Sequence, residues 1–473
     1  MKLLVPFILL ALVSYSCGGP VHNGEDSHQL LIRNVSLIDG NGNEPVIDMD
    51  LLIEGNRIKQ ISKSIEKPSG ADEIDGIGMT VLPGLIDSHV HISSVPGSGY
   101  RKDSSAVIEK LQRHHLKAYL ACGVTTILDP AIKVQEAKKI KKWLSDGQAG
   151  PRLYLLSPAF TAKEGYLATE VLGLDLTFPP VSNVQDIEDR LNESGDLDAR
   201  GVKVFVESGF GFGKMPSLSN DLLQIIKKKS AERNLPLYIH ATDSKDILRA
   251  IDLEPHALVH GAEAGSDEAL AKLKQHPIYL ITTMSVHDSW KIEKDRSRLS
   301  DPYYTATVPE IELRTADTQA AWDLLSSKFA KLVGIDGPTD DIASDSIAGD
   351  AVDPLEIWFQ NVKKQYEAGL PVVMGSDSGN WPVFPQIFHG PTSVREIELL
   401  VLAGLPPIKA IQASTSIPAE MLGLSEDIGT IEEGKIADLI IVKGDPQKNI
   451  RALRNIQWTI LDGIAKKPEQ WME

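Results

Sequence analysis

The feature that most constrains the fold is an alternation of short apolar runs with stretches of helical spacing between residues 84 and 377. The runs are four to eight residues long, and helix formers dominate most of the intervals between them. Such alternation is typical of a parallel sheet in which each strand is followed by a helix, and eight such units close a barrel. We therefore predict an α/β fold, a (β/α)8 TIM barrel. The eight runs are residues 84–91, 124–129, 152–157, 201–207, 235–240, 257–260, 277–283 and 371–377.

The two ends of the chain have a different pattern. Residues 30–37 and 50–61 alternate as strands do, and the same alternation returns at 437–442 and 457–461. We predict that both ends pack together as one small β-sandwich, with residues 30–82 as its first part and 428–473 as its second. The barrel then occupies residues 83–427. Its long interval 284–369 has few strand signals, and we expect it to build a lid or a substrate wall.

The first 17 residues resemble the signal peptide of a bacterial lipoprotein. Lys2 precedes an apolar run over residues 3–13, which is too short to span a membrane, and small residues lead to Cys17. We expect Cys17 to be lipidated and residues 18–29 to form a polar tether. The chain would then be exported and lipid-anchored to a bacterial membrane, facing the periplasm or the cell surface. The alternative is an ordinary signal peptide that happens to contain a cysteine.

The charge balance bears on binding partners. Lys and Arg number 48 against 65 Asp and Glu, a net charge of −17. This excess of acid argues against a nucleic-acid partner, because phosphates are bound by clusters of basic residues. We expect a small-molecule or short-peptide substrate and a membrane contact made by the lipid, and the sequence leaves open whether the protein forms a homo-oligomer.

Histidines gather at the ends of the predicted barrel strands. In a strand, side chains at i and i+2 face the same side, so His89 and His91 both point into the mouth of the barrel. His240 and His260 end the fifth and sixth runs. Four imidazoles that converge on one mouth predict a metal centre. Asp377 ends the eighth run, where an aspartate is either a helix N-cap or a group facing the histidines, and we favour the second role.

Lys203 lies inside the predicted barrel. It alternates with Val202 and Val204 and shares the inward face with Phe205 and Glu207. A buried ammonium without a partner is costly, so Lys203 must lose its proton, pair with an acid such as Glu207, or be chemically modified.

Residues 81–91, VLPGLIDSHVH, resemble the signature of the amidohydrolase superfamily. Residues 55–58, 123–126 and 428–440 resemble further segments of that family, so the similarity covers nearly the whole mature chain. The resemblance implies a binuclear hydrolase, with zinc as the favoured metal. In similar enzymes the lysine of the fourth strand is carboxylated and bridges two metals, and the aspartate of the eighth strand handles the proton. The implied ligands are His89, His91, Lys203 as N6-carboxylysine, His240, His260 and Asp377, with Asp377 also catalytic.

The implied reaction is cleavage of an amide or peptide-like C–N bond by a metal-bridged hydroxide. A small peptide, an acyl-amino acid or a cyclic amide would serve as substrate. Three alternatives stay open: a mononuclear deaminase, a lactone or ester hydrolase, and a lipid-anchored binding protein on the same fold. Lys203 argues against the deaminase branch, which typically lacks that lysine, and the complete ligand set argues against a binding protein.

The resemblance is to the branch of imidazolonepropionase-like proteins and Xaa-Pro and Xaa-Arg dipeptidases. That branch often has Gly-Gly-His after the third strand, where this chain has KEGYL at residues 163–167. We predict that Tyr166 and His287 contact the substrate. The alternatives are a packed loop aromatic for Tyr166 and a surface histidine for His287. Asn380, Trp381 and His389 could line the pocket by their position.

Overall fold

A computed structural model of the chain describes residues 28–168, 178–210, 215–276, 278–333, 353–380, 382 and 384–473. The predicted signal peptide with Cys17, and all of the tether except His28 and Gln29, lie outside these residues. Within the described ranges, no helix combines the length and the apolar character needed to cross a membrane.

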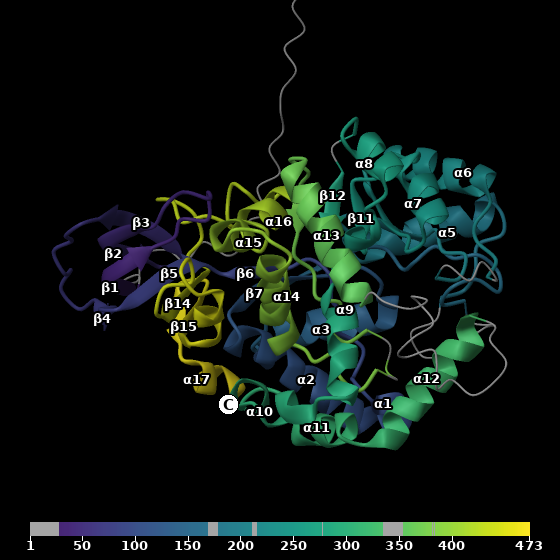
Figure 1. Ribbon diagram of the computed structural model, residues 1–473. Coiled ribbons are helices and arrows are strands. Elements are labelled where there is room, and N and C mark those ends of the chain that lie inside the picture. The colour runs from purple at the N-terminus through teal and green to yellow at the C-terminus, as the bar shows by residue number, and fades with distance from the viewer. Residues whose placement is uncertain are drawn as a thin grey trace, which may run out of the picture.

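The apolar runs form the strands of a parallel barrel (Figure 1). Hydrogen bonds join the first three barrel strands into one sheet and the next five into a second sheet. Parallel bridges between Phe160 and Val204 and between Val90 and Ser378 connect the two sheets at both seams, which closes the barrel. The predicted fold class is thus confirmed. The strands are β6 (Leu85–Asp87), β7 (Val124–Asp129), β8 (Arg152–Leu155), β9 (Val202–Phe205), β10 (Leu237–His240), β11 (Ala257–Val259), β12 (Tyr279–Ile281) and β13 (Val372–Val373).

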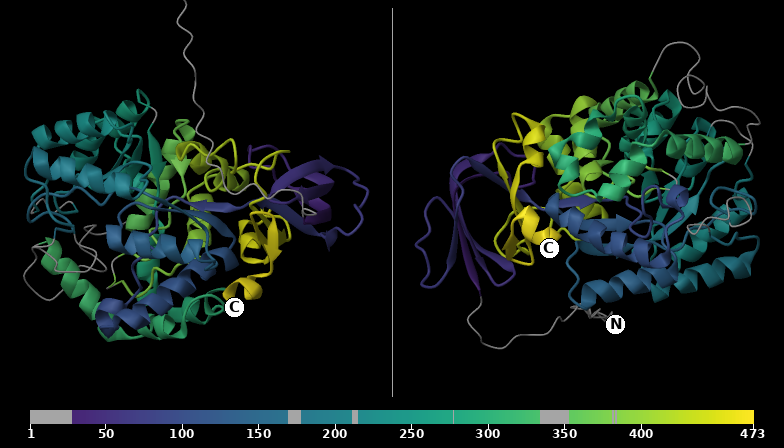
Figure 2. Two further views of the ribbon diagram at one scale, coloured as in Figure 1. Left: turned by 180° about the vertical axis from the view of Figure 1, so that it is seen from behind. Right: turned by 90° about the horizontal axis from the view of Figure 1, so that it is seen from below.

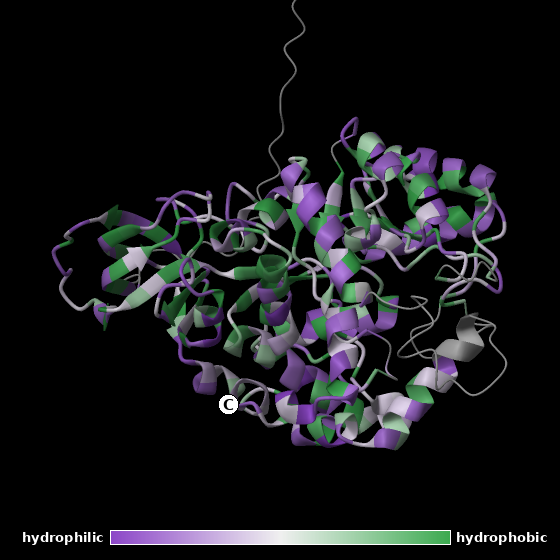
Figure 3. Ribbon diagram, in the orientation of Figure 1, coloured by the Kyte–Doolittle hydropathy of each residue, from purple (hydrophilic) through white to green (hydrophobic). Residues whose placement is uncertain are grey.

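Helices surround the barrel and bury one face each. In α3, Ala137, Ile140 and Trp143 repeat every three residues and are the buried side chains. Apolar side chains on the inner faces and polar ones outside give these helices their two-sided colouring in Figure 3. The helices after the strands are α2 (Ser105–Ala121), α3 (Val134–Ser145), α5 (Val184–Asp196), α6 (Asn220–Ala231), α7 (Ser244–Ile251), α8 (Asp267–Leu273), α13 (Pro354–Glu367) and α14 (Pro391–Leu402). Shorter helices are α1 (Ser98–Arg101), α15 (Pro407–Gln412), α16 (Ser416–Met421) and α17 (Pro468–Met472).

The two chain ends share one sheet beside the barrel. Strand β5 of the N-terminal part pairs antiparallel with β14 of the C-terminal part, and both views of Figure 2 show the purple and yellow segments side by side. At the other edge, β3 hydrogen-bonds to residues 434–437, so the sheet curls around a common apolar core. Its strands are β1 (Gln29–Leu37), β2 (Val46–Glu54), β3 (Arg57–Ser62), β4 (Asp72–Asp75), β5 (Met79–Pro83), β14 (Leu439–Lys443), β15 (Ile456–Leu461) and β16 (Ile464–Lys466).

The long interval between β12 and β13 is helical where it is described. It contains α9 (Ser285–Trp290), α10 (Pro302–Thr305), α11 (Glu310–Ala316) and α12 (Gln319–Val333). Trp322 and Leu325 of α12 belong to an apolar cluster that also contains Tyr166 and Phe205. The inserted segment therefore packs at the mouth of the barrel, where the predicted site residues lie.

Candidate active site

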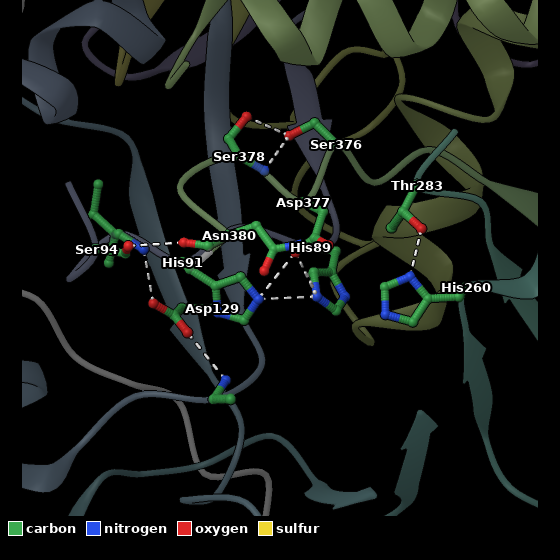
Figure 4. Close-up of polar contacts among 12 residues, drawn as sticks. His89, His91, Ser94, Asp129, His260, Thr283, Ser376, Asp377, Ser378 and Asn380 are labelled. Carbon is green, nitrogen blue, oxygen red and sulfur yellow. Dashed lines mark hydrogen bonds and ion pairs between the residues drawn. The ribbon is translucent and has the colours of Figure 1, made fainter. Parts of the chain in front are cut away.

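Three predicted ligands meet at the mouth of the barrel. His91 Nε2 lies 3.0 Å and His89 Nε2 3.3 Å from Asp377 Oδ1, and the two imidazole nitrogens are 3.3 Å apart. Figure 4 shows the three side chains pointing toward one another. Asp377 is buried, and Oδ1 lacks a hydrogen bond of good geometry. Although burial raises the pKa of Asp377, the neighbouring His89 and His91 hold it well below its usual value, so the carboxylate is ionised.

His240 and His260 complete the ring of imidazoles. Their ring centroids are 4.5 Å apart, and the His260 ring is 5.6 Å from the His89 ring. Burial, together with Lys203 near His240 and with His240 near His260, holds the pKa of both rings well below the usual value. Both rings are therefore neutral at pH 7, which is the form that binds a metal.

Backbone conformations at the strand ends aim these side chains. His260, Thr283 and Asp377 all have left-handed φ values, of 61°, 56° and 57°. This region is uncommon for residues other than glycine, and it is a true outlier for a β-branched residue such as Thr283. His260 Nδ1 and Thr283 Oγ1 are 2.7 Å apart (Figure 4), which leaves His260 Nε2 as the available ligand atom.

Lys203 is buried on β9, with 1% of its surface exposed. Among the described residues, no carboxylate lies within ion-pair distance of its Nζ. Glu207, the alternative partner, accepts hydrogen bonds instead from Gly209 N, Phe210 N and Thr242 Oγ1, at 2.6–2.7 Å. Burial lowers the pKa of Lys203 to about 7, so a large part of the amine is unprotonated at neutral pH. The pairing of Lys203 with Glu207 is not formed.

The six predicted ligand residues line one pocket. Tyr166 lines it too, and the Tyr166 ring stacks on His240 with centroids 4.8 Å apart. Asn380 is a further lining residue, and its Nδ2 donates to Asp377 Oδ2 at 2.7 Å. The carboxylate of Asp377 is thus held through one oxygen while the other faces the histidines.

Two histidines considered for substrate contacts lie elsewhere. His287 packs edge-on against Trp358, with ring centroids 4.1 Å apart, and is not among the side chains that line the pocket in the described part of the chain. His389 is buried and hydrogen-bonds with Tyr119 OH and Ser94 O. Trp381 lies outside the described residues.

Asp87 has no role among the predicted site residues. The Asp87 carboxylate accepts hydrogen bonds from Ser376 Oγ at 2.5 Å, Ser393 Oγ at 2.6 Å and His89 N at 3.2 Å. It therefore ties the first barrel strand to the residue before Asp377. Asp87 precedes His89 by two residues, so in a strand both side chains face the inside of the barrel. This spacing could have identified Asp87 from the sequence.

The donor set fits divalent cations. Imidazole nitrogens and carboxylate oxygens are the ligands that zinc prefers, and His89, His91 and Asp377 offer ligand atoms that all lie within 4.8 Å of one another. Buried His89 Nδ1 also lacks a hydrogen-bond partner, whereas His240 Nε2 lies 3.3 Å from Glu207 Oε2. Polar atoms left unpaired around a buried pocket are expected where a metal normally satisfies them.

Comparisons with known proteins point the same way. Residues 80–465 match the amidohydrolase family. A dihydroorotase of Geobacter metallireducens is 24% identical over 456 residues, which cover 93% of each chain. Among solved structures, a Xaa-Pro dipeptidase with bound methionine has a TM-score of 0.71 and 23% identity, covering 93% of this chain and all of its own. Ochratoxinase of A. niger has a TM-score of 0.69 and 18% identity, covering 94% of this chain and 96% of its own.

Proposed function

Since the chain belongs to the amidohydrolase family and is a hydrolase of C–N bonds, we propose that it is a binuclear enzyme that cleaves an amide or peptide-like bond. The substrate would be a small peptide, an acyl-amino acid or a cyclic amide. The observation that carries this proposal is the convergence of four imidazoles and Asp377 on one pocket that also contains a buried Lys203 without a carboxylate partner among the described residues. The similarity to a Xaa-Pro dipeptidase supports a peptide-like bond.

Lys203 supplies the bridge in this proposal. With its pKa at about 7, its unprotonated amine can attack carbon dioxide, forming an N–C bond and releasing one proton. The product is a carbamate, which carries one negative charge and two oxygens. This change turns a costly buried cation into an anion that suits a site for two cations.

Asp377 would handle the proton. Two divalent cations bound at the site would polarise the substrate carbonyl and lower the pKa of the attacking water. The ionised Asp377 carboxylate accepts a proton from that water through Oδ1, while Asn380 holds Oδ2. As the C–N bond breaks, Asp377 returns this proton to the leaving nitrogen.

The experiment that tests the proposal is elemental mass spectrometry of the full chain purified with bicarbonate, followed by assays on dipeptides, acyl-amino acids, cyclic amides and lactones. We expect about two metal ions per chain and hydrolysis of amides. One metal per chain would indicate a mononuclear, deaminase-like site, and hydrolysis of lactones alone would indicate an esterase. A chain that binds no metal after reconstitution would contradict the proposal and favour a binding protein.

A further inference from the structure

Four aromatic rings gather on one side of the pocket, and we call them the aromatic wall: Tyr166, Phe178, Phe205 and Phe210. Tyr166, Phe178 and Phe205 line the pocket directly. Tyr166 packs edge-to-face on Phe205 with ring centroids 5.0 Å apart, and Phe210 packs edge-to-face on Tyr166 at 5.3 Å. These are favourable geometries for aromatic pairs, so the rings form one continuous apolar surface.

The aromatic wall begins at the metal site. The Tyr166 ring lies nearly parallel to His240, at an interplanar angle of 25°, and Phe205 meets the same imidazole edge-on at 5.2 Å. A substrate whose carbonyl lies among the histidines therefore has its nearest substituent against these rings.

The backbone holds the aromatic wall in place. Phe210 has a φ of 53°, which is strained for a bulky residue, and Glu207 accepts hydrogen bonds from Gly209 N and Phe210 N in this conformation. On the other side, Thr161 Oγ1 donates to the Tyr166 carbonyl at 2.6 Å, and Phe178 N donates to the Leu167 carbonyl at 2.9 Å. Rings fixed before binding lose little conformational freedom when a ligand packs on them.

The order of the strands places the aromatic wall opposite the proton donor. Phe205 belongs to β9, the fourth strand of the closed barrel, whereas Asp377 follows β13, the eighth. Fourth and eighth strands face each other across an eight-stranded barrel. Because Asp377 must reach the leaving nitrogen to protonate it, the acyl half of the substrate points the other way.

We propose that the aromatic wall is the acyl subsite and that it selects amides with an uncharged aromatic or large apolar acyl substituent. This inference rests on the proposed amide hydrolysis and names its substrate class. Packing an apolar group on the rings removes its apolar surface from water, whereas a charged group would lose its hydration there.

The test compares N-methyl amides that differ only in the acyl group, with the full-length, metal-loaded chain. We expect kcat/KM for phenylacetyl to exceed that for acetyl by about tenfold or more, and succinyl, with its free carboxylate, to be the poorest. A second series keeps the acetyl group and varies the amine, with benzylamine or methylamine as the leaving group. The ratio of kcat/KM between these two acetamides should be much smaller than the ratio between the phenylacetyl and acetyl amides.

Variants locate the effect. Tyr166→Ala and Phe210→Ala should each reduce the phenylacetyl-to-acetyl ratio at least about threefold, whereas Tyr166→Phe keeps the ring and should keep the ratio. Trp458→Ala, which removes a ring from β15 of the terminal sheet, is the matched control and should also keep it. Metal content measured on each variant shows that the site itself is intact.

Binding of ketones, which resemble amides but cannot be hydrolysed, separates this inference from the proposed reaction. By calorimetry, the Kd of the metal-loaded chain for 1-phenylbutan-2-one should be about tenfold or more lower than its Kd for butan-2-one, and Tyr166→Ala should remove this difference. Absence of any amide hydrolysis, with this binding preference present, would overturn only the reaction. Equal binding of both ketones, equal rates for phenylacetyl and acetyl, or an unchanged ratio in Tyr166→Ala with full metal content would overturn the acyl subsite.

Discussion

Lys203 illustrates how much of the site rests on one buried side chain. Its neighbours are barrel residues rather than solvent, and Glu207 is already engaged with the loop amides. An alanine at this position would leave space where the proposed bridge stands.

We therefore expect Lys203→Ala to lose at least half of the bound metal and to reduce kcat/KM by roughly a hundredfold or more. Added acetate or formate should restore part of both, because a small carboxylate fits the vacated space. Elemental analysis measures the bound metal, and assays of amide hydrolysis measure kcat/KM. Lys110→Ala, at an exposed position of α2, is the control. Full metal content and full turnover in Lys203→Ala would contradict the bridging role.

Asp377 is the residue on which proton transfer is proposed to depend. Asp377→Asn keeps the shape of the side chain and one oxygen, but the amide cannot accept the proton from water. We expect kcat to fall by about 10²–10⁴-fold while more than half of the metal stays bound. Asp196→Asn, at an exposed salt bridge, is the control. A kcat within tenfold of the parent chain at full metal content would show that another group moves the proton.

At the scale of elements, α11 is attached to α2 by one buried pair. His115 Nε2 of α2 lies 2.6 Å from Glu312 Oε1 of α11. Burial raises the pKa of Glu312 to about 7 and, with His114 nearby, lowers that of His115 well below its usual value. Below pH 7 the pair is thus a protonated carboxyl that donates to a neutral imidazole.

This pair predicts a pH dependence of stability. The pKa of Glu312 rises from 4.5 in the unfolded chain to about 7 in the folded one, so its stabilising contribution is complete below pH 4.5 and is lost as the pH rises through 7. Glu312→Gln does not titrate. We expect the Tm difference between parent chain and variant to be larger at pH 5 than at pH 8. A difference that grows toward pH 8 would show that the ionised carboxylate is the stabilising form.

The elements also show what sequence patterns could predict. Period-two runs and strand-end polar residues locate the barrel strands and place the six predicted ligand residues on their inward faces, because side-chain direction in a strand follows from position alone. The left-handed backbone of Phe210 and Thr283 is invisible in the same patterns, since neither residue favours it. His287 falls close to a strand end in sequence, but α9 begins at Ser285 and turns its ring toward Trp358.

At the scale of the whole molecule, the anchoring of the chain is an open proposal. We propose that Cys17 carries a lipid and that residues 18–29 link it to β1. Cys17→Ser should move the protein from the membrane fraction to the soluble fraction of a bacterial host, and labelled palmitate should be incorporated only by the parent chain. Buried Cys122→Ser is the control for loss of a thiol. Equal membrane association of Cys17→Ser and the parent chain would contradict lipidation.

The pairing of β5 with β14 joins two segments that are synthesised at very different times. Strand β5 is made long before its partner β14, which spans Leu439–Lys443 and follows the whole barrel in the sequence. Gly84 N, at the entrance to the barrel, likewise donates to the carbonyl of Asp438. Strand β5 therefore stays incompletely paired until the barrel and β14 have both been synthesised. A polypeptide that stopped before Asp438 would leave both β5 and the entrance to the barrel without these partners.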